Sequence, residues 1–220
     1  PTAGEALDIV TPQYIQDLFS WTAIGARTTE SQSHRKMASG FSSVVGFKNG
    51  TDGNIDIAIQ ALMSVAGDHN FVSINPDGNV AVVRTSGNPN SHIILRGGKR
   101  PNYSAEHIAE YEQKLDKAGY PHNIMVDCSH ANSGKKAVNQ SVVLDDVAKQ
   151  ILNGNKSIMG IMMESNLNFG KQSIPADLSE LKYGVSVTDE CIDWESTEDV
   201  LRDFSAKIKE TLNQRSAVIL

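Results

Sequence analysis

Short apolar runs of strand length recur along this chain, and each is followed by polar or glycine-rich residues and then by a helical pattern. The runs cover residues 21–26, 44–47, 93–95, 124–127 and 158–163, with a shorter one at 3–7. This alternation is typical of βαβ units and predicts an α/β fold with a parallel sheet. Most runs lack the polar alternation of half-exposed strands, so we expect a sheet that is covered on both faces.

Four segments repeat apolar residues every three or four positions, as on the buried face of a helix. They begin after Asp52, after Ser104, near Val142 and at Ser196. Gly119 and Gly154 mark the ends of the second and third segments. Ser196 and Asp199 have capping-box spacing, which predicts that the last helix begins there. The apolar positions are Ile55, Ile59, Leu62, Met63, Ile108, Tyr111, Leu115, Ala118, Val142, Val147, Ile151, Val200, Leu201, Phe204, Ile208 and Leu212.

Residues 71–84 contain two β-rich runs around an NPDG turn, which predicts an inserted β-hairpin. The rest of the chain has no internal repeat, no low-complexity tract and no break in composition. We therefore expect residues 1–220 to form one domain.

Charge and composition exclude several classes of protein. The 20 Lys and Arg against 26 Asp and Glu give a net charge of −6, which argues against nucleic-acid binding but allows a local cationic pocket. No apolar run approaches the roughly 20 residues of a membrane span, and the first residues do not resemble a signal peptide. The two cysteines, Cys128 and Cys191, cannot form a disulfide framework. We expect a cytoplasmic protein without a membrane partner.

Charged or polar side chains follow nearly every predicted strand. Arg27, Lys48, Arg96, His130 and Glu164 each stand at the carboxyl end of a run. In a (β/α)₈ barrel these ends form the rim where catalytic groups from different strands converge. The sequence therefore predicts a functional site at this edge of the sheet.

The cations among these residues suit an anionic ligand. Arg27, Lys48 and Arg96, with Lys99 and Arg100 nearby, could hold a phosphate or a carboxylate. A single exposed Arg or Lys more often forms a surface salt bridge. Lys48 and Arg96, however, end apolar runs and precede Asn-Gly and Gly-Gly, which favours an anion site.

His130 and Glu164 offer an imidazole nitrogen and a carboxylate oxygen, a set that suits Zn, Mn, Fe or Co. Asp189 is a third candidate, whose alternative role is a helix cap. Cys128 is more simply a buried filler than a ligand. The other histidines are expected to have structural roles: His34, His69, His92, His107 and His122.

Five motifs occur in order: GARTTES (25–31), GFKNGTDG (46–53), HIILRGGK (92–99), DCSHAN (127–132) and MESN (163–166). Together they resemble type I 3-deoxy-D-arabino-heptulosonate-7-phosphate (DAHP) synthases, and the likeness runs from residue 1 to about residue 202. The resemblance implies a (β/α)₈ TIM barrel, of which this chain holds roughly strands 3 to 8.

The resemblance also implies an activity, the first step of the shikimate pathway of aromatic amino acid biosynthesis. Phosphoenolpyruvate and erythrose 4-phosphate would condense to DAHP and inorganic phosphate with one divalent metal ion. By motif, Gly25, Ala26, Arg27, Lys48 and Arg96 would bind phosphoenolpyruvate. Lys48 and His130 would be catalytic, and the metal ligands would be His130, Glu164 and Asp189.

The chain departs from the family pattern at its start. The family's upstream cysteine ligand and Lys-Pro-Arg segment have no counterpart here, and the first residue is Pro1. We therefore expect a C-terminal piece of a longer chain, in which Cys128 does not replace the missing ligand.

Regulation and assembly are further expectations from the family. The segments matching its aromatic amino acid effector pocket include Asp8, Ile9, Pro12, Gln13 and Ser42, whose alternative role is ordinary packing. The sequence does not choose between Phe, Tyr and no effector. A homo-oligomer is expected, of unspecified size.

Two other functions stay open. The isolated chain could be an inactive fragment that binds phosphate and an effector. It could also belong to another phosphate-handling, metal-dependent TIM-barrel synthase or aldolase.

Overall fold

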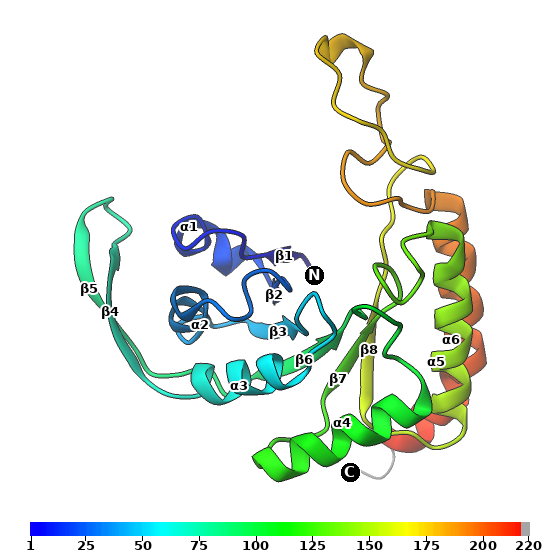
Figure 1. Ribbon diagram of the computed structural model, residues 1–220, viewed down its shortest axis with the longest axis horizontal. Coiled ribbons are helices and arrows are strands. Elements are labelled where there is room, and N and C mark those ends of the chain that lie inside the picture. Colours follow the sequence, from blue (N-terminus) through cyan, green and yellow to red (C-terminus); the bar gives the residue numbers. More distant parts are fainter. Residues whose placement is uncertain (217–220) are drawn as a thin grey trace.

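The computed structural model describes residues 1–216 and contains a six-stranded sheet in which every strand runs parallel to its neighbours. In spatial order the strands are β1 (Ala3–Glu5), β2 (Trp21–Ile24), β3 (Val44–Lys48), β6 (Ser91–Leu95), β7 (Ile124–Asp127) and β8 (Ile158–Met162). Within the described residues, β1 pairs with β2 alone and β8 with β7 alone, so the sheet is an open arc. Figure 1 shows this arc with the helices along its outer side.

Helices connect the strands and cover the convex face of the sheet (Figure 1). They are α1 (Pro12–Ile15), α2 (Gln32–Ala38), α3 (Asp56–Val65), α4 (Ala105–Ala118), α5 (Gln140–Leu152) and α6 (Trp194–Ser216). Single 3₁₀ turns are η1 (Gln16–Leu18), η2 (Ala137–Asn139) and η3 (Leu178–Glu180). The arrangement is a segment of an α/β barrel, as predicted.

The hydrophobic core lies between the sheet and the helices. Phe47 on β3 and Ile93 on β6 are paired in register, and both are fully buried in this core with Leu62 of α3 and Leu115 of α4. Successive residues of a strand point to opposite faces. The neighbour of Phe47, Lys48, therefore projects from the concave face, where a complete barrel has its interior.

The predicted strands are all present, but three of the predicted helices differ from expectation. In α3, Met63 was predicted on the buried face but is 55% exposed, because the buried face runs through Ile59 and Leu62. In α5, Val142 was predicted on the buried face but is 60% exposed, and the next residue, Val143, is buried in its place.

The last helix begins at Trp194, because the Asp193 carboxylate accepts the Ser196 backbone N–H at 2.8 Å and caps the first turn. The prediction that it begins at Ser196 was wrong by two residues.

The α2 helix was not predicted because its buried face is polar. His34 and Arg35 are buried in it beside Met37 and Ala38. The Arg35 guanidinium donates to the Thr29 and Ile57 carbonyls. A pattern that counts only apolar residues does not detect such a helix.

The predicted hairpin forms a separate two-stranded antiparallel sheet, β4 (His69–Ile74) and β5 (Val80–Thr85). It extends away from the arc on the side of α2 and α3 (Figure 1). Gly78 has a φ of 81° in its turn, a conformation that favours glycine. Across residues 1–216, the helices lack a stretch long and apolar enough to cross a membrane.

Neighbouring residues of α3 offer a matched test of this core. Leu62 is 1% exposed and Met63 is 55% exposed. We expect Leu62→Ala to lower the free energy of unfolding by about 2–5 kcal/mol, because it leaves a cavity. Met63→Ala should change it by less than about 0.5 kcal/mol. Urea unfolding of the two variants measures both values, and equal losses would contradict the described orientation of α3.

Candidate functional site

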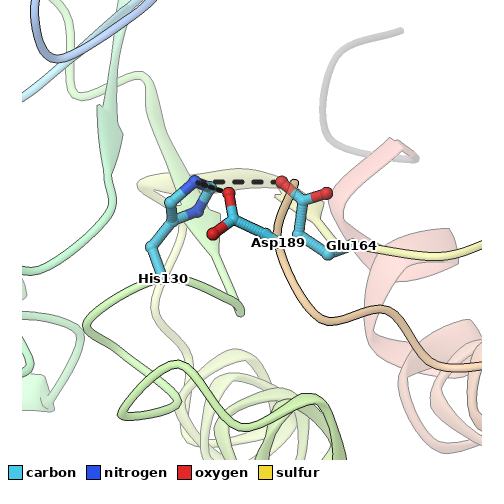
Figure 2. A group of neighbouring side chains, drawn as sticks. All are labelled: His130, Glu164 and Asp189. Carbon is cyan, nitrogen blue, oxygen red and sulfur yellow. Dashed lines mark ion pairs between the residues drawn. The ribbon is translucent and has the colours of Figure 1, made fainter. Parts of the chain in front are cut away.

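Three predicted metal ligands meet beyond the carboxyl ends of β7 and β8. The His130 Nε2 atom lies 3.4 Å from Asp189 Oδ2 and 3.8 Å from Glu164 Oε1. One donor atom from each side chain lies within 4.8 Å of the other two. Figure 2 shows the imidazole facing both carboxylates. The structure therefore brings His130, Glu164 and Asp189 together as a candidate cation site.

Hydrogen bonds to the backbone of Glu164 fix the position of this residue. Gln140, at the start of α5, is fully buried. Its side-chain amide donates a hydrogen bond to the Glu164 carbonyl at 2.9 Å and accepts one from the Glu164 N–H at 2.8 Å, which fixes the Glu164 backbone. The Ile192 N–H also donates to the Glu164 carbonyl. Sequence reasoning missed Gln140, because nothing in its local pattern points to a residue 24 positions later.

Asp189 comes from the long connection between β8 and α6. Two backbone hydrogen bonds join Gly170 to Cys191 there, and Ser165 forms an isolated bridge with Ile192. The chain thus leaves β8, extends outward and returns beside its own start (Figure 1). The return places Asp189 opposite His130, and the alternative role as a helix cap belongs to Asp193.

His130 lies in a tight turn after β7. Its φ is 51°, in the left-handed region that non-glycine residues adopt at a cost of about 1–2 kcal/mol. The turn is closed by the Lys135 N–H, which donates to the His130 carbonyl at 2.7 Å, and by the Ser133 hydroxyl. A costly conformation at a polar strand end is common in functional sites.

Asp127 lies behind His130 and was named in the sequence only as part of a motif. Its Oδ2 atom is 2.8 Å from His130 Nδ1 and 3.2 Å from Lys48 Nζ. Burial alone would raise the pKa of this carboxyl, but the imidazole and the ammonium outweigh it and lower the pKa. Asp127 is therefore a buried anion that contacts both Lys48, a predicted anion-binding residue, and His130, a predicted metal ligand.

Glu164 has the opposite shift. Burial raises its pKa, His130 and Lys48 lower it, and the neighbouring carboxylates of Asp127 and Asp189 raise it further. Carboxyl groups crowded around one imidazole repel each other, and a divalent cation would relieve that repulsion. The imidazole and carboxylate donors fit such an ion.

The predicted anion-binding residues surround the neighbouring strand ends. Lys48 is buried as the last residue of β3, Arg96 is half-buried after β6, and Arg27 is exposed after β2. The Gly25 carbonyl accepts the N–H groups of Thr28 and Thr29 in a tight turn, and Ala26 lies half-buried beside it. The Thr29 hydroxyl also donates to the Lys48 carbonyl at 2.8 Å, which joins this turn to β3.

Three buried asparagines connect the loops that follow β3, β6 and β7. Asn49 accepts the Arg96 backbone N–H at 2.8 Å and donates to the Gly97 carbonyl. Asn102 donates to Asn49, and Asn132 accepts the Asn102 N–H and donates to the Leu95 carbonyl. Sequence reasoning missed Asn49 and Asn102, because their contacts with Arg96 and Asn132 join residues 47 and 30 positions apart.

The remaining histidines and Cys128 lie outside this cluster. Each of these histidines has a hydrogen-bond partner away from the three candidate ligands: His34, His69, His92, His107 and His122. Cys128 is fully buried in the core between sheet and helices, and burial raises the pKa of its thiol. A protonated, core-facing thiol does not suit a metal ligand.

The five candidate effector residues separate. Ile9 and Gln13 line a cavity of about 90 Å³ whose other wall is the hairpin, through Phe71, Ser73 and Val83. Asp8 and Pro12 line a neighbouring cavity of about 220 Å³ under Phe19. The Asp8 carboxylate accepts the N–H groups of Val10 and Thr11, a local turn contact. Ser42 is exposed before β3.

Comparisons with known proteins show which family this chain resembles in sequence and fold. A model described as "DAHP synthetase I family" matches residues 1–202. The "Phospho-2-dehydro-3-deoxyheptonate aldolase, Tyr-sensitive" of Escherichia coli (strain K12) is 54% identical over 217 residues, which cover 99% of this chain and 61% of that protein. The Phe-sensitive enzyme of the same organism is 54% identical over 209 residues, covering 95% of this chain and 59% of that protein.

A solved structure gives the same result. The phospho-2-dehydro-3-deoxyheptonate aldolase of Francisella tularensis SCHU S4 matches with a TM-score of 0.90 and 45% identity, over 95% of this chain and 61% of that one. The chain thus spans about three fifths of the length of these relatives.

The loops after β3 and β6 touch backbone to backbone at Gly98. A Cβ atom added there would lie 2.2 Å from the Gly53 nitrogen and 2.3 Å from the Asp52 carbonyl carbon. We expect Gly98→Ala to separate the loops and lower the free energy of unfolding by about 1–3 kcal/mol. In the control Gly67→Ala, the new Cβ would meet nothing nearer than 3.7 Å, and stability should not fall. Thermal unfolding of both variants tests the contact, which equal melting temperatures would disprove.

Proposed function

Because the chain belongs to the DAHP synthetase I family, we propose that its site condenses phosphoenolpyruvate with erythrose 4-phosphate to give DAHP and inorganic phosphate. The observation that carries this proposal is the arrangement around Asp127. A buried lysine at the end of β3 and an imidazole facing two carboxylates contact the same carboxylate oxygen. This arrangement supports an anion site and a cation site side by side on one edge of the sheet.

His130, Glu164 and Asp189 are the residues that would hold the divalent metal. Their donors suit an ion of the Mn, Fe, Co or Zn type. When bound there, such an ion supplies Lewis-acid polarisation of the aldehyde oxygen. Three protein donors would leave at least one coordination position of a four-coordinate ion for another ligand, as a catalytic metal requires.

Arg27, Lys48 and Arg96 would hold phosphoenolpyruvate. Arginine forms paired hydrogen bonds with phosphate oxygens, and a lysine ammonium acts as a compact charge between phosphate and carboxylate. The turn at Gly25 and Ala26 would provide backbone contact with the phosphate. These cations offset the negative charge of the substrate while the reacting atoms are brought together.

The proposed reaction changes bonds at two carbons of phosphoenolpyruvate. Its terminal methylene carbon forms a bond with the aldehyde carbon of erythrose 4-phosphate as the carbon–carbon double bond opens, and the aldehyde oxygen takes up a proton to become a hydroxyl. Water adds at the carbon that carries the phosphate and gives up one proton. The new hydroxyl passes its proton to the departing phosphate as the carbon–oxygen bond to phosphate breaks and a ketone forms. Lys48 is the group proposed for proton transfer. A cytoplasmic homo-oligomer is part of the same proposal and rests on the family resemblance.

Removal of a proposed ligand should abolish both metal binding and turnover. We expect His130→Ala and Glu164→Ala in the intact protein to lose bound metal and to lower phosphate release at least 100-fold, since the chemistry needs the ion. The control His122→Ala removes a half-exposed histidine that contacts Asp116, and it should keep both properties. Metal content and phosphate release measure this, and variants with full metal and activity would refute the assignment.

The same assay separates the alternatives. Phosphoenolpyruvate binding without phosphate release would indicate an inactive binding fragment. Phosphate release in proportion to phosphoenolpyruvate consumed excludes an aldolase, and the aldose that supports it separates DAHP synthase from related sugar-phosphate synthases.

The cavity between α1 and the hairpin is the proposed effector site. Aromatic amino acid inhibition is supported by the Tyr-sensitive and Phe-sensitive names of the relatives and by a half-open cavity lined by an amide, Gln13, and an aromatic ring, Phe71. We expect Phe71→Ala to weaken inhibition by Tyr or Phe about tenfold or more, because the ring contact is lost.

The matched control is Val82→Ala, which lies on the exposed face of the same hairpin. It should leave the inhibition constant unchanged. Inhibition curves with each amino acid would identify the effector. Equal sensitivity of Phe71→Ala and the unchanged protein would rule out this cavity.

A further inference from the structure

Asp127 is the one acidic side chain among the buried polar residues of the described chain, and it has 0% exposure. Its Oδ1 atom accepts the Ser129 backbone N–H at 2.9 Å. Its Oδ2 atom contacts Lys48 and His130, both from outside its own strand. A charge this deep is costly unless it is paired, so its retention at the end of β7 requires an explanation.

The contact with His130 involves the nitrogen that faces away from the other two carboxylates. Asp127 lies at Nδ1, and Glu164 and Asp189 lie at Nε2. A carboxylate accepts hydrogen bonds and donates none, so it favours the imidazole form that carries its proton on Nδ1. That form leaves the lone pair of Nε2 directed at the cation site.

The Asp127 Oδ2 and His130 Nδ1 atoms face each other, and Asp127 Oδ2 also lies 3.2 Å from the Lys48 ammonium. Asp127 Oδ2 and His130 Nδ1 are buried, and neither has a well-aligned hydrogen bond within residues 1–216, although they are 2.8 Å apart. Buried polar atoms are almost always hydrogen-bonded. A small rotation of the imidazole would align this pair and fix the direction of Nε2.

Lys48 offsets the free-energy cost of burying the Asp127 carboxylate. Its ammonium lies 3.2 Å from Asp127 Oδ2, and its side chain is 10% exposed. An opposite charge at this distance offsets the cost of burying the carboxylate. The Asp127 carboxylate is thus held between the Lys48 ammonium and the His130 imidazole, where it orients the imidazole.

We propose that Asp127 is a positioning residue, which holds the His130 imidazole with Nε2 toward Glu164 and Asp189 and thereby raises the affinity of this site for a divalent cation. The identity of the site rests on the proposed function, but the orientation rests on the contacts alone. A carboxylate that accepts a hydrogen bond from the second ring nitrogen of a metal-binding histidine typically raises the metal affinity 10- to 100-fold.

The test is the affinity of the intact protein for Mn²⁺ without substrates, measured by competition with a chromogenic chelator. We expect Asp127→Asn, which keeps the shape and removes the charge, to weaken Mn²⁺ binding 10- to 100-fold. The control Thr22→Val removes another buried hydrogen bond, between Thr22 and Ser43, and should leave Mn²⁺ affinity within about twofold. Equal affinities for Asp127→Asn and unchanged protein would overturn the proposal.

A second pair of variants covers the case in which Asp127→Asn leaves Lys48 unpaired and fails to fold. Lys48→Met and Lys48→Met/Asp127→Asn have both already lost the ammonium, so their difference isolates Asp127. At least a tenfold weaker affinity in the double variant supports the proposal, and equal affinities overturn it. Because no substrate is present, loss of the proposed synthase activity would not alter this result.

Discussion

The parallel direction of all six strands is the constraint on which the site depends. Because neighbouring strands run in the same direction, their carboxyl ends lie at one edge of the sheet. The residues that follow the strands therefore lie close together at that edge. The register pairs Lys48 of β3 with Ile94 of β6, while Asp127 ends β7. Side-chain alternation then sends Phe47 to the helices and Lys48 to the concave face. Cations and carboxylates meet because of backbone geometry.

Polar groups buried at this edge stabilise one another and limit how far the loops can move. The asparagines at 49, 102 and 132 satisfy backbone groups of three successive loops, and Gln140 does the same for Glu164. Each buried group left unpaired would cost about 1–3 kcal/mol. These side chains have no chemical role in the proposed reaction. They act by fixing the loops at the carboxyl ends of the strands relative to one another.

The sequence was informative wherever the signal was local. Fully covered strands read as apolar runs, and the charges that follow them could be located from chain order alone. Lys48 ends β3 as expected, and Arg96, His130 and Glu164 follow β6, β7 and β8. The contacts of Asp127 and Gln140 could not be predicted, because their partners are distant in sequence and lie close only after the sheet forms. The α2 helix escaped detection because it buries an arginine and a histidine. The start of α6 shifted because Asp193, rather than Ser196, caps it.

The three candidate ligands differ in how firmly the chain holds them. His130 and Glu164 follow strands of the main sheet, whereas Asp189 lies on a long connection whose outgoing and returning arms pair mainly with each other. A segment that is bonded mainly to itself opens locally at a cost below the global unfolding free energy. Opening of this connection would remove one negative charge from the cluster while the barrel segment stays folded. Such an opening would also take away one of the three candidate donors, so release of a bound ion would be coupled to the motion of this connection.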